Sequence, residues 1–187
     1  MPPESADDEA FEVKVWRDEC LARCVGKDAD EWLSEFLQTE CRLVYLPADR
    51  MRQVDPNYAE EGDQTGFADG FPLLLISEAS LQDLNSRMSE PLPMERFRPN
   101  LVVAGCEPYA EDQWKRIRIG EIEFKVVKPC SRCAITTVDP ETAQTGVEPL
   151  KTLSSYRRQG NKVNFGQNLI HAGIGELRLG MDVEVIE

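Results

Sequence analysis

Two segments of the chain share one pattern of apolar and polar residues, and this pattern limits the folds that the chain can adopt. Residues 117–126 (IRIGEIEFKV) and 177–186 (LRLGMDVEVI) each start with an apolar residue, an arginine, an apolar residue and a glycine. Apolar and polar residues then alternate. Alternation with a period of two, broken by a short turn, is typical of a β-hairpin. We therefore predict a hairpin in each segment.

Other apolar stretches add strands and a few short helices. Strands are predicted at 11–15, 42–46, 71–76 (FPLLLI), 101–104 and 134–138 (AITTV), and a loop at 165–168 (FGQN). Helices are predicted at 29–38 with Asp28 and Glu31 as a capping box, after Ser77 with Leu81, Leu84 and Met88 inward, and from Pro149 to about Gly160. The fold class that follows is a β-rich α+β domain, a closed or nearly closed β-barrel with a few short helices.

Charge and composition exclude several classes of protein. The net charge is −13, and residues 1–70 carry most of the excess, with 18 acidic and 7 basic residues. Nucleic-acid binding normally needs a basic surface, so we expect none. The chain has no apolar run of membrane-spanning length and no signal peptide, so we expect no membrane association and a cytoplasmic protein with reduced thiols.

A polar stretch rich in Asp, Glu, Pro and Gly interrupts the pattern of strands at residues 47–69. Such composition is typical of a connection between domains. We accordingly divide the chain into a first region, 1–58, and a larger domain, 59–187.

The stretch KPCSRC, Lys128 to Cys133, is the strongest candidate for chemistry. Two thiols lie three residues apart beside Lys128 and Arg132. Neighbouring cations favour the thiolate, the form of cysteine that binds metals and attacks electrophiles. A redox motif should open a helix, whereas Cys133 precedes a predicted strand. Two readings stay open: buried structural thiols, or a zinc site of four thiolates that pairs Cys130 and Cys133 with Cys20 and Cys24.

Several further residues suit ligand contact without proving it. Ser77 stands where a helix begins, and a hydroxyl there either caps the helix or meets an anion. Arg98 precedes Pro99, which favours an extended backbone, and it stands with Asn100 at the mouth of a strand. The single histidine, His171, is interpreted as a surface or hydrogen-bonded residue.

The ordered set FADGFPLLLISEASLQDLN, MERFRPNLVVAG, AEDQW, VVKPCSRCAITTVDPET, EPLKTLSSYR and NFGQNLI resembles the MOSC domain family. The resemblance covers about residues 67–187 and is strongest to the amidoxime-reducing branch. Residues 11–58 resemble the closing part of the N-terminal β-barrel region that precedes MOSC domains. Relatives have a longer upstream segment with further contacts to the cofactor phosphate, so we expect this chain alone to hold the cofactor weakly, if it is active at all.

The resemblance implies a molybdenum cofactor, a molybdopterin with its metal, and assigns residues to it. Cys133, the second thiol of the motif, matches the position of the metal ligand and is our candidate catalytic residue. The candidate cofactor-binding residues are Asp69, Ser77, Arg98, Asn100, Ser131, Arg132, Cys133 and Asn168. Arg98 and Arg132 would face the cofactor phosphate. We expect neither an iron–sulfur cluster nor pyridoxal phosphate in this chain.

The activity implied by the resemblance is the reduction of small N-hydroxylated compounds. Electrons would come from an external donor of the ferredoxin or of the cytochrome and flavoprotein type. A second hypothesis is a carrier that holds the cofactor, or a persulfide on Cys133, and passes it on without reducing a substrate. The same thiolate would serve in either case.

Overall fold

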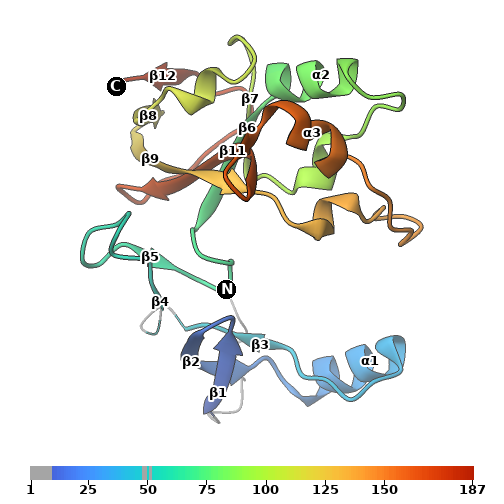
Figure 1. Ribbon diagram of the computed structural model, residues 1–187. Helices are drawn as coiled ribbons and strands as arrows, with labels where there is room; N and C mark the ends of the chain where they lie inside the picture. The colour runs from blue at the N-terminus through green and yellow to red at the C-terminus, as the bar shows by residue number, and fades with distance from the viewer. Residues whose placement is uncertain (1–9, 48–49, 51) are drawn as a thin grey trace. The chain divides into compact units, whose positions relative to one another are not determined.

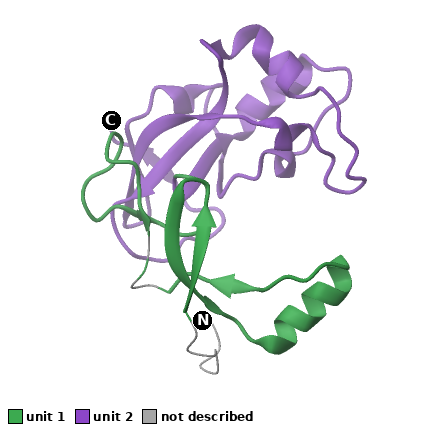
Figure 2. Cartoon of the chain, turned by 60° about the horizontal axis from the view of Figure 1, so that its bottom comes forward, with its two compact units in different colours: residues 1–70 green, residues 71–187 purple. Residues whose placement is uncertain are grey.

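The structure, a computed structural model, describes residues 10–47, 50 and 52–187. It divides into two compact units, Met1–Gly70 and Phe71–Glu187 (Figure 2). The predicted boundary at residue 58 lies twelve residues before this division, because the segment that follows it still pairs within the first unit. No helix in the described residues has the length and apolarity needed to cross a membrane.

The described part of the first unit contains two small sheets and one α-helix. Strands β1 (Ala10–Val15), β2 (Asp18–Cys24) and β3 (Val44–Tyr45) form an antiparallel sheet in that order, and β4 (Arg52–Gln53) pairs with β5 (Gln64–Thr65). The strands predicted at 11–15 and 42–46 are thus confirmed, the second one shortened. Helix α1 (Lys27–Leu37) follows β2 (Figure 1).

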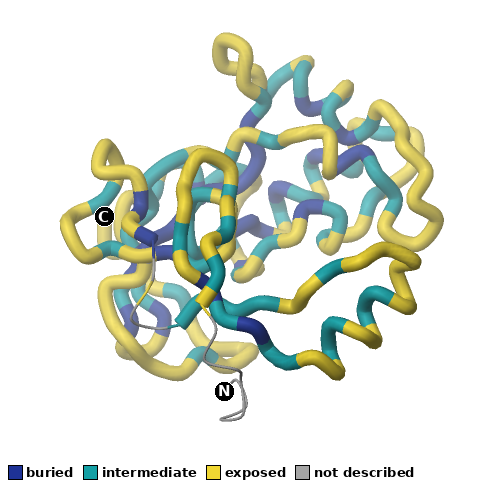
Figure 3. The backbone as a smooth tube through the Cα atoms, turned by 90° about the horizontal axis from the view of Figure 1, so that it is seen from below, coloured by how far each residue is buried: buried dark blue, intermediate teal, exposed yellow. Residues whose placement is uncertain are grey.

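Helix α1 forms where the sequence predicts it, but its start differs from the prediction. The N-cap is Gly26 and no side chain caps the helix, so the predicted capping box of Asp28 and Glu31 is wrong. The carboxylate of Asp30 instead accepts the Leu43 backbone N–H at 2.7 Å, which ties the helix to the segment before β3. The helix has no buried residue (Figure 3).

One buried guanidinium holds the first unit together. Arg52 donates to Asp18 Oδ2 from Nε at 3.0 Å and from Nη2 at 2.6 Å. It also donates to the backbone carbonyls of Gly66, Ala68 and Asp69 at 2.9–3.1 Å. Only 6 % of its side chain is exposed. Arg52 therefore connects strand β2 to the segment that leads into the second unit.

We expect Arg52→Ala to lower the free energy of unfolding of the first unit by about 2–3 kcal/mol, since the Asp18 carboxylate and three backbone carbonyls lose a buried, charged donor. Urea titration followed by tryptophan fluorescence would measure the loss. Arg17→Ala removes an exposed arginine from the β1–β2 turn and should change stability by less than about 0.5 kcal/mol. Equal effects from the two substitutions would contradict the role assigned to Arg52.

The second unit is a curved seven-stranded sheet that forms a nearly closed barrel. Its strands run in the order β12-β8-β9-β11-β6-β7, with β10 paired to β11 outside that path. They are β6 (Leu73–Ser77), β7 (Leu101–Val103), β8 (Arg116–Ile119), β9 (Ile122–Ser131), β10 (Arg158–Gln159), β11 (Lys162–His171) and β12 (Val183–Val185). This confirms the predicted β-rich α+β fold class.

Helices cover one side of this sheet (Figure 1). They are α2 (Glu78–Ser86), α3 (Leu150–Tyr156) and the 3-10 turns η2 (Met94–Phe97), η3 (Ala110–Asp112) and η4 (Ala134–Thr137). Alternation along β6 divides the core, since Leu75 packs inside the barrel with Phe124 while Ile76 packs under the helices with Phe97. The helices predicted after Ser77 and from Pro149 are confirmed. The predicted end of the second near Gly160 is wrong, because the helix ends at Tyr156 and Arg158–Gln159 is strand β10.

Three local predictions are wrong. Residues 177–186 do not form a hairpin: only Val183–Val185 is a strand, and it pairs with β8. Residues 134–137 form the turn η4 and not a strand, because the β-branched run begins where the chain leaves the sheet. Residues 165–168 are not a loop but the middle of β11, where the ladder with β9 contains an extra residue between Asn164 and Gln167.

Candidate functional site

The KPCSRC stretch forms the end of β9 and the chain that leaves it. Ser131 is the last residue of the strand, and Cys133 occupies the N-cap position of η4. The Cys133 carbonyl accepts the Thr136 N–H at 3.3 Å and the Thr136 hydroxyl at 3.0 Å. These bonds fix the backbone at Cys133 while its side chain stays exposed. The turn thus presents the thiol to solvent from a defined position.

Arg132 is held across the end of the sheet. Its backbone N–H donates to the Val163 carbonyl at 2.8 Å, and its guanidinium donates to the Phe97 carbonyl at 2.7 Å and to Cys130 Sγ at 3.0 Å. The Nε atom is buried and has no hydrogen-bond partner among the described residues. Cys130 therefore orients Arg132, a role that the sequence does not indicate.

Arg98 and Asn100 lie on the connection between η2 and β7. Arg98 is exposed and adopts a left-handed backbone (φ 54°, ψ 47°), so the predicted extended conformation is wrong. Its backbone N–H closes the last turn of η2 on Glu95, which outweighs the preference set by Pro99. The Asn100 side chain accepts the Leu74 N–H at 2.8 Å, which anchors this connection to β6.

Asn168, in β11, lies between strands β6 and β9. It pairs with Leu74 on one side and with Lys128 on the other, and its Nδ2 donates to the Lys128 carbonyl at 3.2 Å. The structure therefore brings together six of the predicted site residues at neighbouring segments of one unit. They are Arg98, Asn100, Ser131, Arg132, Cys133 and Asn168.

Ser77 lies elsewhere, at the opposite end of β6. Three residues of strand separate it from Leu74, a distance of roughly 10 Å. Ser77 is fully buried and caps α2, since its hydroxyl accepts the Ser80 N–H at 3.0 Å. Its own backbone N–H donates to the Glu111 carboxylate at 3.1 Å. Burial raises the pKa of the nearby Cys106 thiol, although a hydrogen bond with Ser77 opposes the shift. The structure thus gives Ser77 a capping role.

Asp69 belongs to the first unit. Its carboxylate accepts the Trp16 indole N–H at 3.0 Å, and its carbonyl accepts from Arg52. Its assignment to the cofactor stays a prediction. His171 is exposed at the end of β11 with Nδ1 3.0 Å from the Gly173 carbonyl, which confirms its interpretation as a hydrogen-bonded surface residue.

Arg96 is one of the basic residues that the sequence places near the strand mouth, but it is not among the predicted site residues. Its Nη2 donates to Asp139 Oδ2 at 2.7 Å, its side chain is 9 % exposed, and its buried Nε has no partner among the described residues. Hydrogen bonds from the Thr142 backbone and hydroxyl, aided by the Arg96 charge, lower the pKa of Asp139. The pair joins η2 to the chain beyond Cys133. The sequence contains a signal for this residue, since Arg96 lies two positions before Arg98 in the same stretch, MERFRPN.

The zinc alternative is wrong. Cys20 and Cys24 lie four residues apart on the extended strand β2, which separates them by roughly 13 Å. Two thiolates on one zinc lie within about 4 Å of each other, because each Zn–S bond is about 2.3 Å long. Within the described ranges, no three His, Cys, Asp or Glu side chains gather in a way that could hold a metal ion.

The remaining residues fit a molybdenum cofactor. A single exposed thiol suits a soft metal whose other ligands come from the cofactor itself. Arg132 offers a buried Nε without a partner, and Arg98 offers an exposed guanidinium, and both suit a phosphate. The thiol therefore suits the metal of such a cofactor, and the two arginines suit its phosphate.

Comparison with known proteins agrees with this chemistry. The MOSC domain model matches residues 62–184. Mitochondrial amidoxime-reducing component 1 of Mus musculus is 39% identical over 198 residues, which cover 99% of this chain and 58% of that protein. The human component 1 is 38% identical (90% and 54% covered) and the human component 2 is 40% identical (84% and 51%). The chain spans little more than half the length of these relatives. By the extent of the family match, the chain belongs to the MOSC domain family.

Proposed function

We propose that this chain is a molybdenum-cofactor-binding oxidoreductase module that reduces small N-hydroxylated compounds with electrons from an external donor. The observation that carries the proposal is the exposed Cys133 thiol next to the anchored guanidinium of Arg132. The names of the relatives support the substrate class, since an amidoxime is an N-hydroxylated compound.

Each residue has a separate task in this proposal. Cys133 would bind the metal as thiolate, while Arg132 and Arg98 would hold the phosphate by charge-assisted hydrogen bonds. Asn100, Ser131 and Asn168 would contribute neutral hydrogen bonds from the neighbouring strands. When bound, the cofactor supplies the two-electron redox chemistry. The overall reaction consumes two electrons and two protons and releases water from the N-hydroxyl group.

The protein contributes position and charge. Hydrogen bonds to Thr136 hold the Cys133 backbone, and the bond to the Phe97 carbonyl holds the Arg132 guanidinium on the same short segment. The backbone at Cys133 and the guanidinium of Arg132 are thereby held in place before any ligand binds. Such preorganisation lowers the entropy that binding would otherwise cost.

The test is reconstitution of the purified chain with molybdenum cofactor. We expect close to one molybdenum per chain by metal analysis, the fluorescence of oxidised pterin, and reduction of an aryl amidoxime when a reduced viologen dye supplies electrons. Absence of bound molybdenum and pterin after reconstitution would refute the proposal.

The exposure of Cys133 also favours the carrier function, because an accessible thiol can form a persulfide. Intact-mass spectrometry of the freshly purified protein separates the two functions. A mass increase of one sulfur atom on Cys133, together with full cofactor loading and no amidoxime reduction, would establish the carrier and overturn the reductase.

A further inference from the structure

The last strand of the sheet in the second unit has an open edge. Among the described residues, only β6 pairs with β7. The pairing is parallel, with Ile76 opposite Val102. Leu74 bonds to Asn100 through both its N–H and its carbonyl, so the residues of β6 that face β7 are Leu74 and Ile76. In a parallel ladder Ile76 then bonds to the residues on either side of Val102, and the peptide groups of Val102 point away from β6. Such unpaired groups can receive a further strand.

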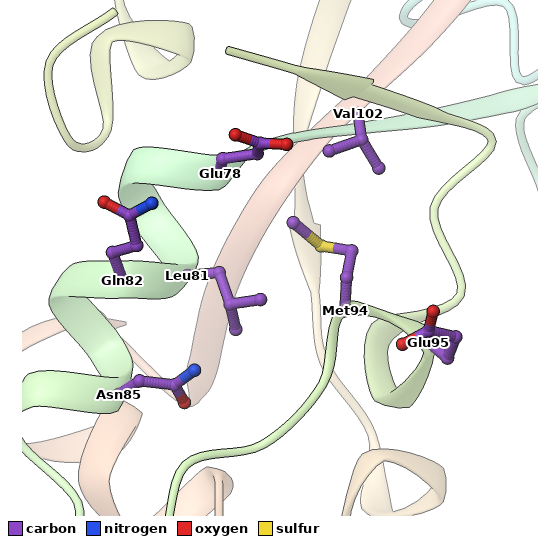
Figure 4. A pocket seen from close by; sticks show the side chains of 7 residues that line it. All are labelled: Glu78, Leu81, Gln82, Asn85, Met94, Glu95 and Val102. Atoms are coloured by element: carbon purple, nitrogen blue, oxygen red, sulfur yellow. The ribbon is translucent and has the colours of Figure 1, made fainter. Parts of the chain in front are cut away.

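A cavity of about 470 Å³ lies beside this edge, between α2 and η2. Its apolar wall consists of Leu81, Met94 and Val102, and Figure 4 shows Leu81 and Met94 pointing toward each other near Val102. Val102 is 47% exposed although it lies in a strand. A strand added to β7 would place alternate side chains on this same face of the sheet.

The rim of the cavity is acidic. Glu78 at the start of α2 and Glu95 in η2 both line it and are exposed, and no lysine or arginine lines it. The arginine of α2 is directed elsewhere: Arg87 pairs with Asp83 at 2.8 Å and lies over the ring of Tyr156. The cavity therefore combines an apolar interior with two uncompensated carboxylates.

We propose that the edge of β7 and this cavity together bind an extended segment of a partner protein. The segment adds to the sheet as a strand, places one apolar side chain in the cavity and directs lysine or arginine toward Glu78 and Glu95. Main-chain hydrogen bonds supply affinity in this mode of recognition, and the pocket for a side chain supplies specificity. A second copy of this chain fits poorly, because two chains of charge −13 repel each other.

The probe is a synthetic peptide of sequence KTVKLTVK, acetylated and amidated at its ends, added to the full chain. We expect the backbone amide signal of Val102 to shift in NMR spectra and its hydrogen exchange to slow. The same peptide with glutamate in place of lysine should bind at least tenfold more weakly, because like charges meet across the contact. A peptide N-methylated at alternate residues should lose binding, because it cannot pair with a strand.

Variants locate the contact. Glu78→Gln combined with Glu95→Gln should weaken binding roughly fivefold, a size typical of exposed charge pairs. Glu90→Gln, which removes an exposed carboxylate that does not line the cavity, should leave binding unchanged. Unchanged exchange at Val102, equal binding of the N-methylated peptide, or equal effects of the double and the Glu90 variants would each overturn the proposal.

Discussion

The Cys133→Ala variant is expected to contain no molybdenum above background after reconstitution and to lose amidoxime reduction by roughly 100-fold or more, since even residues behind a metal ligand contribute 10–100-fold. The substitution removes Sγ from an exposed position and leaves the carbonyl of residue 133 free to accept from Thr136. The backbone and the neighbouring Arg132 should therefore stay in place. Metal analysis and turnover with a viologen donor measure the effect.

Two other thiols serve as controls. Cys20→Ala, in strand β2 of the first unit, should keep full metal content and activity. Cys130→Ala should produce an intermediate loss, because Arg132 then lacks the sulfur that accepts from its Nη1. Thermal denaturation should show all three variants folded. Full activity in the Cys133 variant would eliminate this residue as the metal ligand, and with it the main support for the proposed function.

The sequence predicted the inner strands of the sheet better than the strand at its edge. The buried strand predicted from the apolar run 71–76 and the hairpin predicted from alternation at 117–126 are both found in the structure, the first as Leu73–Ser77. The segment 177–186 shows the same pattern but forms only one short strand, which pairs with the edge of β8 that β9 leaves free. Pattern alone does not reveal which strands have a free neighbour.

The site was predicted in part for a related reason. Asn168 stands far from Arg98 and Asn100 in the sequence, and the resemblance to a family identified all three before any geometry was known. What the sequence could not show is how Ser77 is used, because a hydroxyl at a helix start serves as a cap or as an anion contact with the same local pattern. Burial decides for the cap here.

The misread segment FGQN leads to the second prediction. Glycine and amide residues are typical of loops, yet Gly166 lies in β11 at φ +81°, where the ladder with β9 contains its extra residue. A bulge of this kind uses glycine because other residues rarely adopt that backbone. The bulge separates the pairing of Asn164 with Ser131 from the pairing of Asn168 with Lys128. Gly166 therefore sets the register of the predicted site.

We expect Gly166→Ala to lower the free energy of unfolding of the second unit by roughly 3–5 kcal/mol, from a strained backbone and overpacking together. A Cβ at this position would lie 2.6 Å from Ile76 Cγ1 and 2.8 Å from the Leu75 carbonyl oxygen, and the latter belongs to a paired strand that cannot move aside. Urea denaturation measures the loss, and cofactor retention should fall with it because the positions of Asn168 and Ser131 depend on the bulge.

Gly160→Ala is the matched control. Gly160 also has a positive φ, +61°, but a Cβ there meets nothing within 4 Å, so only the backbone strain of about 1–2 kcal/mol remains. The difference between the two variants isolates the contact of position 166 with β6. If both glycine variants lose the same stability, the close approach at the bulge has no energetic weight. The register of the site would then have to be set by the side chains of β9 and β11 alone.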